Sequence, residues 1–208
     1  MTFGSSDRAS RLAIALILCI GWGVAGLAVK ADQAPQVQPS WTLEQLMLGL
    51  SKIKNATTNF IEDQYIGILT KPLHSSGVLV YVAPSRLEKD SLVPTRQSVI
   101  IDGDKLTVRQ ANGQTRTVTL QDHPEIGAFV ESLRSTLSGD LGILSRFYDV
   151  GFTGSADHWQ LTLEPSDQKV RKLVKTIRIE GSNFSLSSVE ILHADGDRSV
   201  MTMTKSSP

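Results

Sequence analysis

The sequence predicts a mainly β protein of the α+β class, an unclosed and strongly curled antiparallel half-barrel with an N-terminal helix and a helical insert covering an apolar cavity. Three observations predict this fold. Ten or eleven short segments of strand pattern follow one another between turn dipeptides. So many strands do not fit one flat sheet in a small domain, so the sheet is expected to curl. One helical segment, residues 122–148, interrupts the strands and must lie on the sheet.

Residues 1–31 are predicted to be a signal peptide. Two arginines precede an apolar run over residues 12–29, and Ala31 supplies a small residue for cleavage. The run is close in length to a membrane span, so an uncleaved anchor is the alternative. Cleavage after Ala31 would remove Cys19, the single cysteine of the chain, and leave the mature protein without a disulfide.

A linker and then one domain are predicted after the leader. Residues 32–40 contain two prolines and no apolar period, which is typical of a linker. The domain, residues 41–206, opens with a short amphipathic helix that Thr42 and Gln45 are expected to cap. Its apolar stripe consists of Leu43, Leu46, Met47, Leu50 and Ile53.

The strands are predicted from alternating polarity and from turn residues. Asp102-Gly103, Asn112-Gly113 and Asp195-Gly196 are expected to form tight hairpin turns. The predicted strands cover residues 59–69, 77–83, 86–91, 97–101, 105–109, 115–120, 149–154, 158–164, 172–180, 186–193 and 198–204.

Several strands show which side chains face inward. The strand over residues 77–83 is apolar on both faces, which fits a core on one side and a lid or ligand on the other. Met201 and Met203 share one face of the last strand. The side chains expected to face the core from the other late strands are Trp159, Leu161, Leu163, Ile177 and Ile179.

The helix predicted over residues 122–137 carries an apolar face made of Ile126, Phe129, Val130, Leu133 and Leu137. Asp122 and Glu125 resemble a capping box, and Gly139 follows the expected end. A second short helix is expected to start at Asp140, with Leu141, Leu144 and Phe147 on one side. Ordinary core packing and a lid that lifts to admit an apolar ligand both explain these faces, and the sequence leaves the two open.

Composition and motifs exclude several function classes. Lysine plus arginine equal aspartate plus glutamate, and no basic stripe alternates with aromatics, so no nucleic-acid partner is predicted. None of the four histidines has metal-ligand spacing with another, and no phosphate loop or nucleophile elbow is present. No cofactor, no metal and no catalytic residues are therefore predicted.

Five stretches are informative through their order and spacing along the chain. They are Phe60-Ile-Glu-Asp-Gln64, Ser76-Gly-Val-Leu-Val-Tyr-Val-Ala-Pro84, Ile101-Asp-Gly-Asp-Lys-Leu106, Trp159-Gln-Leu-Thr-Leu-Glu-Pro165 and Asp195-Gly-Asp-Arg-Ser199. Together with the order of elements, they resemble the periplasmic outer-membrane lipoprotein carrier (LolA) family. The ending Gly196-Asp-Arg-Ser199 resembles a divergent branch whose members lie beside acyltransferases and lipid exporters.

The resemblance implies a periplasmic carrier, acting as a monomer, that binds a lipidated or acyl-chain cargo and passes it from the inner toward the outer membrane. An inner-membrane exporter or release complex and an outer-membrane acceptor are the implied partners. Aliphatic and methionine side chains suit acyl chains better than polar metabolites. The expected ligand-binding residues of cavity and lid are Val78, Val80, Ile126, Phe129, Val130, Leu133, Leu144, Phe147, Trp159, Leu161, Leu163, Met201 and Met203.

One position departs from the family pattern. The carriers have an arginine, before the proline after the second strand, that bonds to the lid, and Ala83 stands there in this chain. That lock cannot be carried over, although Arg86 lies nearby. Cargo identity stays open between a lipoprotein, a free glycolipid and an acyl polyene. The alternative functions are an enzyme that tailors a lipid or polyketide, or an envelope lipid sensor. An inward-facing Asp63, Glu62 or histidine beside a second titratable group would favour the enzyme.

Overall fold

The computed structural model describes residues 41–204 of the chain. The predicted signal peptide and linker lie outside the described residues. No helix in the described part is long and apolar enough to span a bilayer.

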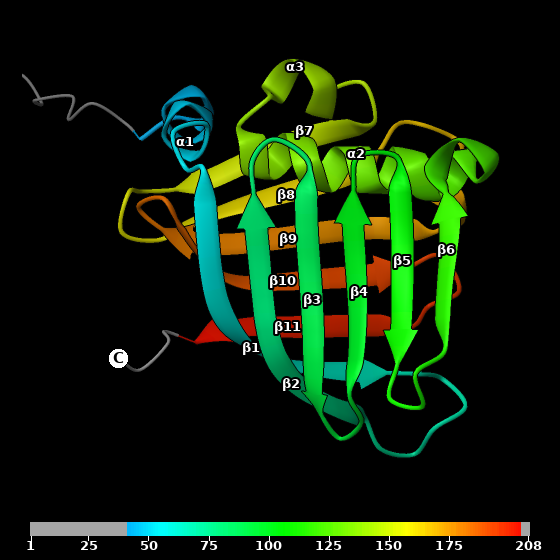
Figure 1. Ribbon diagram of the computed structural model, residues 1–208. Helices are drawn as coiled ribbons and strands as arrows, with labels where there is room; N and C mark the ends of the chain where they lie inside the picture. Colours follow the sequence, from blue (N-terminus) through cyan, green and yellow to red (C-terminus); the bar gives the residue numbers. More distant parts are fainter. Residues whose placement is uncertain (1–40, 205–208) are drawn as a thin grey trace, which may run out of the picture. The chain divides into compact units, whose positions relative to one another are not determined.

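One curled antiparallel sheet of eleven strands dominates this part of the chain (Figure 1). Its spatial order is β6-β5-β4-β3-β2-β1-β11-β10-β9-β8-β7, so the first and last strands of the chain meet in the middle. The strands are β1 (Asn55–Tyr65), β2 (Leu73–Val82), β3 (Arg86–Val93), β4 (Gln97–Asp102), β5 (Lys105–Gln110), β6 (Thr115–Thr119), β7 (Tyr148–Gly154), β8 (Trp159–Pro165), β9 (Val174–Ser182), β10 (Ser185–His193) and β11 (Arg198–Thr204).

All eleven predicted strands are present, but their boundaries differ. The first two begin at Asn55 and Leu73, earlier than the predicted residues 59 and 77, and most other ends shift by one or two residues. The first strand ends at Tyr65, whereas alternation predicted residue 69, because pairing with β11 stops at Tyr65 opposite Arg198. Beyond it, the Gly67 N–H donates to the Asp197 side chain at 2.9 Å instead of joining the ladder. The ninth strand starts at Val174, later than predicted, because a 3-10 helix, η2 (Val170–Lys172), precedes it.

The sheet is unclosed, and the helical insert crosses its opening. β6 and β7 follow one another in the sequence but form the two opposite edges of the sheet. The insert between them comprises η1 (Leu120–Asp122), α2 (Pro124–Ser138) and α3 (Leu141–Leu144). In Figure 1, β7–β11 run crosswise behind β2–β6, and the helices gather at the end where β2, β4 and β6 finish. The predicted half-barrel with helices over its opening is therefore confirmed.

A close approach between β2 and β3 contributes to the curl. The register between the two strands shifts at Gly77. A side chain there would collide with the neighbouring backbone, because its Cβ would lie 1.8 Å from the Asp90 carbonyl oxygen. Only glycine permits this contact, and such irregularities increase local twist.

The helix ends show which capping signals the fold used. α1 (Leu43–Leu50) has the predicted Thr42–Gln45 capping box. Gly139 ends α2 with a φ of 69°, and the Asp140 side chain accepts a hydrogen bond at the start of α3, as predicted. The predicted Asp122 cap of α2 is wrong, because Asp122 is taken up by η1 and His123 precedes the helix without a side-chain cap.

The hydrophobic core lies between the helices and the late strands. Leu46, Met47 and Leu50 of α1 pack with α3 and with the inward residues of β8 and β9. Trp159, Leu161, Leu163, Ile177 and Ile179 are all fully buried there, as the alternation predicted.

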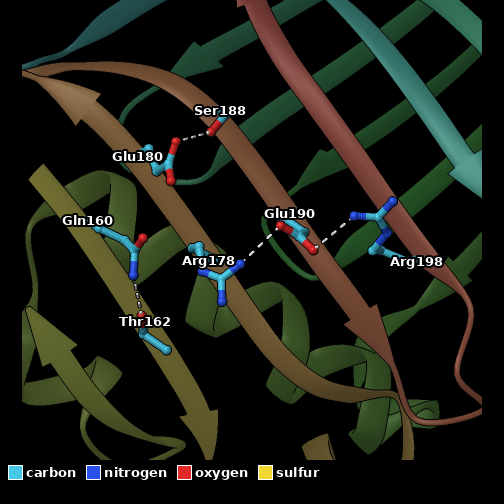
Figure 2. Close-up of polar contacts among 7 residues, drawn as sticks. All are labelled: Gln160, Thr162, Arg178, Glu180, Ser188, Glu190 and Arg198. Atoms are coloured by element: carbon cyan, nitrogen blue, oxygen red, sulfur yellow. Dashed lines mark hydrogen bonds and ion pairs between the residues drawn. The ribbon is translucent and has the colours of Figure 1, made fainter. Parts of the chain in front are cut away.

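The opposite face of the late strands is polar (Figure 2). Arg178 donates to Glu190 at 3.2 Å, and Arg198 donates to the other oxygen of Glu190 at 3.4 Å. Ser188 donates to Glu180 at 3.2 Å on the same face. Such exposed pairs contribute at most about 1 kcal/mol each, so this face is best described as a solvated surface.

Candidate functional site

The candidate site lies on the face of the sheet that bears Trp159 and Leu161, which we name the inner face. Directly paired residues of antiparallel strands point to the same side, so the register traces this face across the sheet. One row of paired residues runs from Leu161 through Ile179, Val189, Met201, Glu62 and Ser75.

A large part of the inner face of β2–β6 is apolar but incompletely covered. Its residues form what we name the open apolar surface. Each of them is half-buried, in contrast to the fully buried side chains of β8 and β9. The open apolar surface consists of Leu79, Leu87, Val99, Ile101, Leu106, Val108 and Val118.

Helix α2 reaches the β4–β5 hairpin at one end of this surface. Val130 is 2 % exposed, and Phe129 packs against the core cluster while staying partly exposed. The Arg134 side chain, only 13 % exposed, donates a hydrogen bond to the carbonyl oxygen of Gly103 in the β4–β5 hairpin. At the other end of α2, a Cβ on Gly139 would lie 2.0 Å from the Met47 carbonyl oxygen, so α2 and α1 touch closely.

Ala83 and Arg86, the two positions considered for a bond to the lid, make other contacts. Ala83 donates its backbone N–H to the Lys54 carbonyl oxygen at 2.8 Å and has no side chain to reach α2. Arg86 donates to Glu88 at 2.6 Å and to Asp102 at 3.3 Å. These carboxylates hold the pKa of Arg86 above its ordinary value, first through the hydrogen bond that Arg86 donates to Glu88.

The sequence-predicted ligand residues fall into three environments. Six of them are half-buried. Three lie on α2, namely Ile126, Phe129 and Leu133, and the others are Phe147, Met201 and Met203. Five are fully or almost fully buried, namely Val130, Leu144, Trp159, Leu161 and Leu163.

Val78 and Val80 differ from the rest. The register places them on the outer face, where Val80 pairs with Glu88 and Glu88 pairs with Ile100. Leu79 and Tyr81 lie on the inner side of β2 instead. The prediction from the sequence therefore chose the wrong face of this strand as the one shared with Trp159. With apolar residues on both faces, alternation alone could not choose between them.

A cavity of about 710 Å³ opens at the end of the sheet where β3 and β5 finish, away from the helices. We name it the open-end cavity. Its volume is within the usual range of ligand pockets. It is lined by Glu62, Gln64, Pro72, Leu73, His74, Ser75, Lys89, Ser91, Val93, Pro94, Thr95, Arg96, Gln97, Gln110, Ala111 and Asn112.

A buried charged cluster forms the wall of the open-end cavity. Glu62 is 4 % exposed, and its Oε2 accepts from Lys89 at 2.5 Å, from Ser75 at 3.0 Å and from Gln64 at 3.1 Å. The Lys89 ammonium also lies 5.2 Å from the centre of the Phe60 ring. The sequence named Glu62 as an acid that could face inward, but it did not identify Lys89 as its partner. The available signal was parity, because Glu62 is two residues from Phe60 and must share its face.

Tyr81 adds one polar atom to the apolar part of the inner face. The side chain is buried, and its hydroxyl has no hydrogen-bond partner among the described residues. Burial raises the pKa of the Tyr81 phenol above its ordinary value.

No metal centre is formed in the described part of the chain. Among residues 41–204, no three histidine, cysteine, aspartate or glutamate side chains gather to hold an ion. His74 instead bonds to Asp63 at an exposed position.

A family model described as outer membrane lipoprotein carrier protein LolA-like matches residues 32–205. The match spans nearly the whole domain, and the chain therefore belongs to this LolA-like family of carrier proteins. No curated protein matches the chain.

Three solved structures are similar to this chain at low sequence identity. A LolA superfamily protein from Nitrosomonas europaea has 11 % identity and a TM-score of 0.40, covering 81 % of this chain and 96 % of its own. A putative outer membrane lipoprotein-sorting protein domain from Vibrio parahaemolyticus has 7 % identity and a TM-score of 0.39, covering 78 % and 89 %. The MucA/MucB complex of Pseudomonas aeruginosa has 14 % identity and a TM-score of 0.42, covering 80 % and 58 %.

Proposed function

We propose that this protein is a periplasmic carrier that binds the acyl chains of a lipid or lipoprotein on the inner face of its sheet. In this proposal it acts as a monomer and has no catalytic role. It receives its cargo from an exporter or release complex at the inner membrane and passes it to an acceptor at the outer membrane. Export through the predicted signal peptide is part of the proposal, and it is supported by the family match starting at residue 32.

One observation carries the proposal: the open apolar surface is half-buried where its counterpart on β8 and β9 is fully buried. Apolar side chains left partly in water gain free energy when an apolar ligand covers them. Each buried methylene contributes about 0.8 kcal/mol, so ~10 carbons would gain about 8 kcal/mol before ordering costs. Release then needs a partner whose site competes for the same chain.

The proposed contact set follows from this observation. It comprises the open apolar surface, Met201 and Met203 of β11, and the partly exposed residues of α2. Phe147 belongs to the set on the same ground. Trp159 and the other fully buried residues would reach a ligand only if the core opened, so they form its support. Val78 and Val80 are left out because of their outward parity.

The alternative is an enzyme that tailors a lipid on the same scaffold, and the Glu62–Lys89 pair inside the open-end cavity is the observation in its favour. A catalytic base or acid must reach the proton that it transfers. The oxygen of Glu62 closest to Lys89 already accepts three hydrogen bonds, which favours a structural and binding role for the pair. Turnover of a bound acyl ester, abolished in the Lys89→Met variant, would establish the alternative.

The proposal is tested with a charge placed on either face of one strand. Val108 and Thr107 are neighbours on β5, with Val108 on the open apolar surface and Thr107 on the outer face. We expect Val108→Glu to abolish binding of a fluorescent fatty acid, because an unpaired carboxylate would be desolvated against its chain. Thr107→Glu, the matched control, should bind as the wild type does.

Two further measurements separate carrying from mere binding. Transfer of a fluorescent lipid between donor and acceptor vesicles should be faster when the wild-type protein is present. Adding the Val108→Glu variant instead should leave the transfer rate at its protein-free value. Mass spectrometry of lipids that co-purify with the protein from its native envelope would identify the cargo. Unchanged fatty-acid affinity in Val108→Glu would overturn the proposed site.

A further inference from the structure

The polarity of the inner face changes along the strands. Near the helices β3–β5 present Leu87, Ile101 and Leu106, one row of directly paired residues. At the far end the same three strands present Ser91, Gln97 and Gln110, again one paired row. The second row lines the open-end cavity, as does the Glu62–Lys89 pair. A single concave surface is thus apolar at its covered end and polar at its open end.

We infer that the open-end cavity is a binding site for the polar headgroup of the cargo, and that the headgroup is an uncharged, hydroxyl-rich group such as a sugar or glycerol. This inference rests on the proposed function and deepens it, because it assigns the second half of an amphiphile to a separate set of residues. The acyl chain then extends from the cavity along the open apolar surface toward α2.

The cavity adjoins the open apolar surface. Lys89 in its wall pairs directly with Leu79 on one side and with Val99 on the other. The Lys89 side chain spans this boundary, because its ammonium group contacts both the Phe60 ring and the Glu62 carboxylate. An amphiphile bound across the boundary would keep its chain against apolar side chains and its headgroup among polar ones.

The charges of the cavity favour a neutral headgroup. Glu62 and Lys89 neutralise each other at 2.5 Å. Among the described lining residues, the other permanently charged side chain is Arg96 at the exposed rim. Phosphate recognition usually employs converging cations that form charge-assisted hydrogen bonds. A single exposed arginine does not provide such a cluster.

The uncharged lining residues match hydroxyl groups. Side-chain amides and hydroxyls both donate and accept hydrogen bonds, as the hydroxyls of a sugar do, whereas a phosphate oxygen only accepts. Residues of this kind come from five strands, β1 to β5, and their loops. They are Gln64, Ser75, Ser91, Thr95, Gln97, Gln110 and Asn112. Lys89 has three N–H donors, of which Glu62 takes one.

The test uses three amphiphiles with the same eight-carbon chain: octyl glucoside, octanoate and octyl phosphate. Each is titrated calorimetrically into the full mature chain below its micelle concentration. We expect octyl glucoside to bind most tightly. The Gln97→Ala/Gln110→Ala double variant should lose about tenfold in octyl glucoside affinity and less than about twofold for octanoate, since lost hydrogen bonds affect only the headgroup.

The control is Gln160→Ala, which removes the same side chain from the outer face (Figure 2). Gln97 and Gln110 are exposed, so the double variant is expected to fold, and its urea midpoint checks this. Tighter binding of octyl phosphate than octyl glucoside, or an equal loss for all three probes, would overturn the inference alone. Failure of all three to bind the wild type would overturn the proposed function as well.

Discussion

The two halves of the inner face carry similar aliphatic side chains but bury them to different extents. Ile177 on β9 is 0 % exposed beneath the helices, whereas Ile101 on β4 is half-buried. Both residues belong to strands that have a neighbouring strand on each side. Strand pairing therefore does not cause the difference. It is caused by what lies over each half of the face.

The helices explain this asymmetry. α1 and α3 contribute Leu46, Met47, Leu50 and Leu144 to the core cluster with β8 and β9. α2 approaches the other half through Arg134 at the β4–β5 hairpin and leaves the open apolar surface partly accessible. One half thus stabilises the fold, and the other is available to a ligand. Variants at equivalent positions of the two halves can test this division.

The largest expected effect comes from a matched isoleucine pair. Ile177→Ala should lower the free energy of unfolding by about 3–5 kcal/mol, because it leaves a cavity in a packed core. Ile101→Ala should cost no more than about 1.5 kcal/mol and should weaken fatty-acid binding, since its neighbours are already partly solvated. Urea denaturation measures both. Equal losses would show that the two halves do not differ.

The Phe129→Ala variant tests whether helix α2 acts as a cover for the ligand or as an ordinary core helix. A fully buried phenylalanine costs about 3–5 kcal/mol on truncation, and we expect a smaller loss of about 2 kcal/mol because Phe129 stays partly exposed. Fatty-acid affinity should fall at the same time. Hydrogen exchange over residues 126–137 should be fast without ligand and slower with it. Equal protection in both states, with a full-sized stability loss, would make α2 an ordinary core helix.

Arg134→Met should loosen the α2 contact with the β4–β5 hairpin. The side chain keeps most of its volume while losing its hydrogen bond to Gly103, so we expect a loss of about 1–2 kcal/mol. Amide exchange should quicken in α2 and stay unchanged in β8 and β9. Arg146→Met, at an exposed position after α3, is the control and should leave both quantities unaltered.

Tyr81→Phe should produce the smallest change and the opposite sign. Removing a buried hydroxyl that has no partner among the described residues should raise stability by about 0.5–1 kcal/mol. The raised pKa means that the folded state disfavours the phenolate, so Tyr81 lowers stability as pH rises above about 10. The phenylalanine variant should lose this part of the alkaline decline in urea midpoints. A destabilised variant would reveal a hydrogen bond to the hydroxyl.

The sequence by itself determined which segments are strands and helices. Alternation in β8 identified Trp159, Leu161 and Leu163 as one buried face, and Asn112-Gly113 and Gly139 marked a hairpin and a helix end. These features depend on side-chain period and on backbone conformations that glycine favours, and both are local properties of the chain. The motifs in their order were enough to predict the family.

Tertiary structure alone decided which apolar residues are covered and which polar ones face inward. Ile177 and Ile101 look alike in the sequence, and only the placement of α1 and α3 buries one of them completely. Parity could place Glu62 on the inner face, but only the folded sheet brings Lys89 from β3 within 2.5 Å of it. Register and curvature couple residues that are distant along the chain, and a local period contains no information about such pairs.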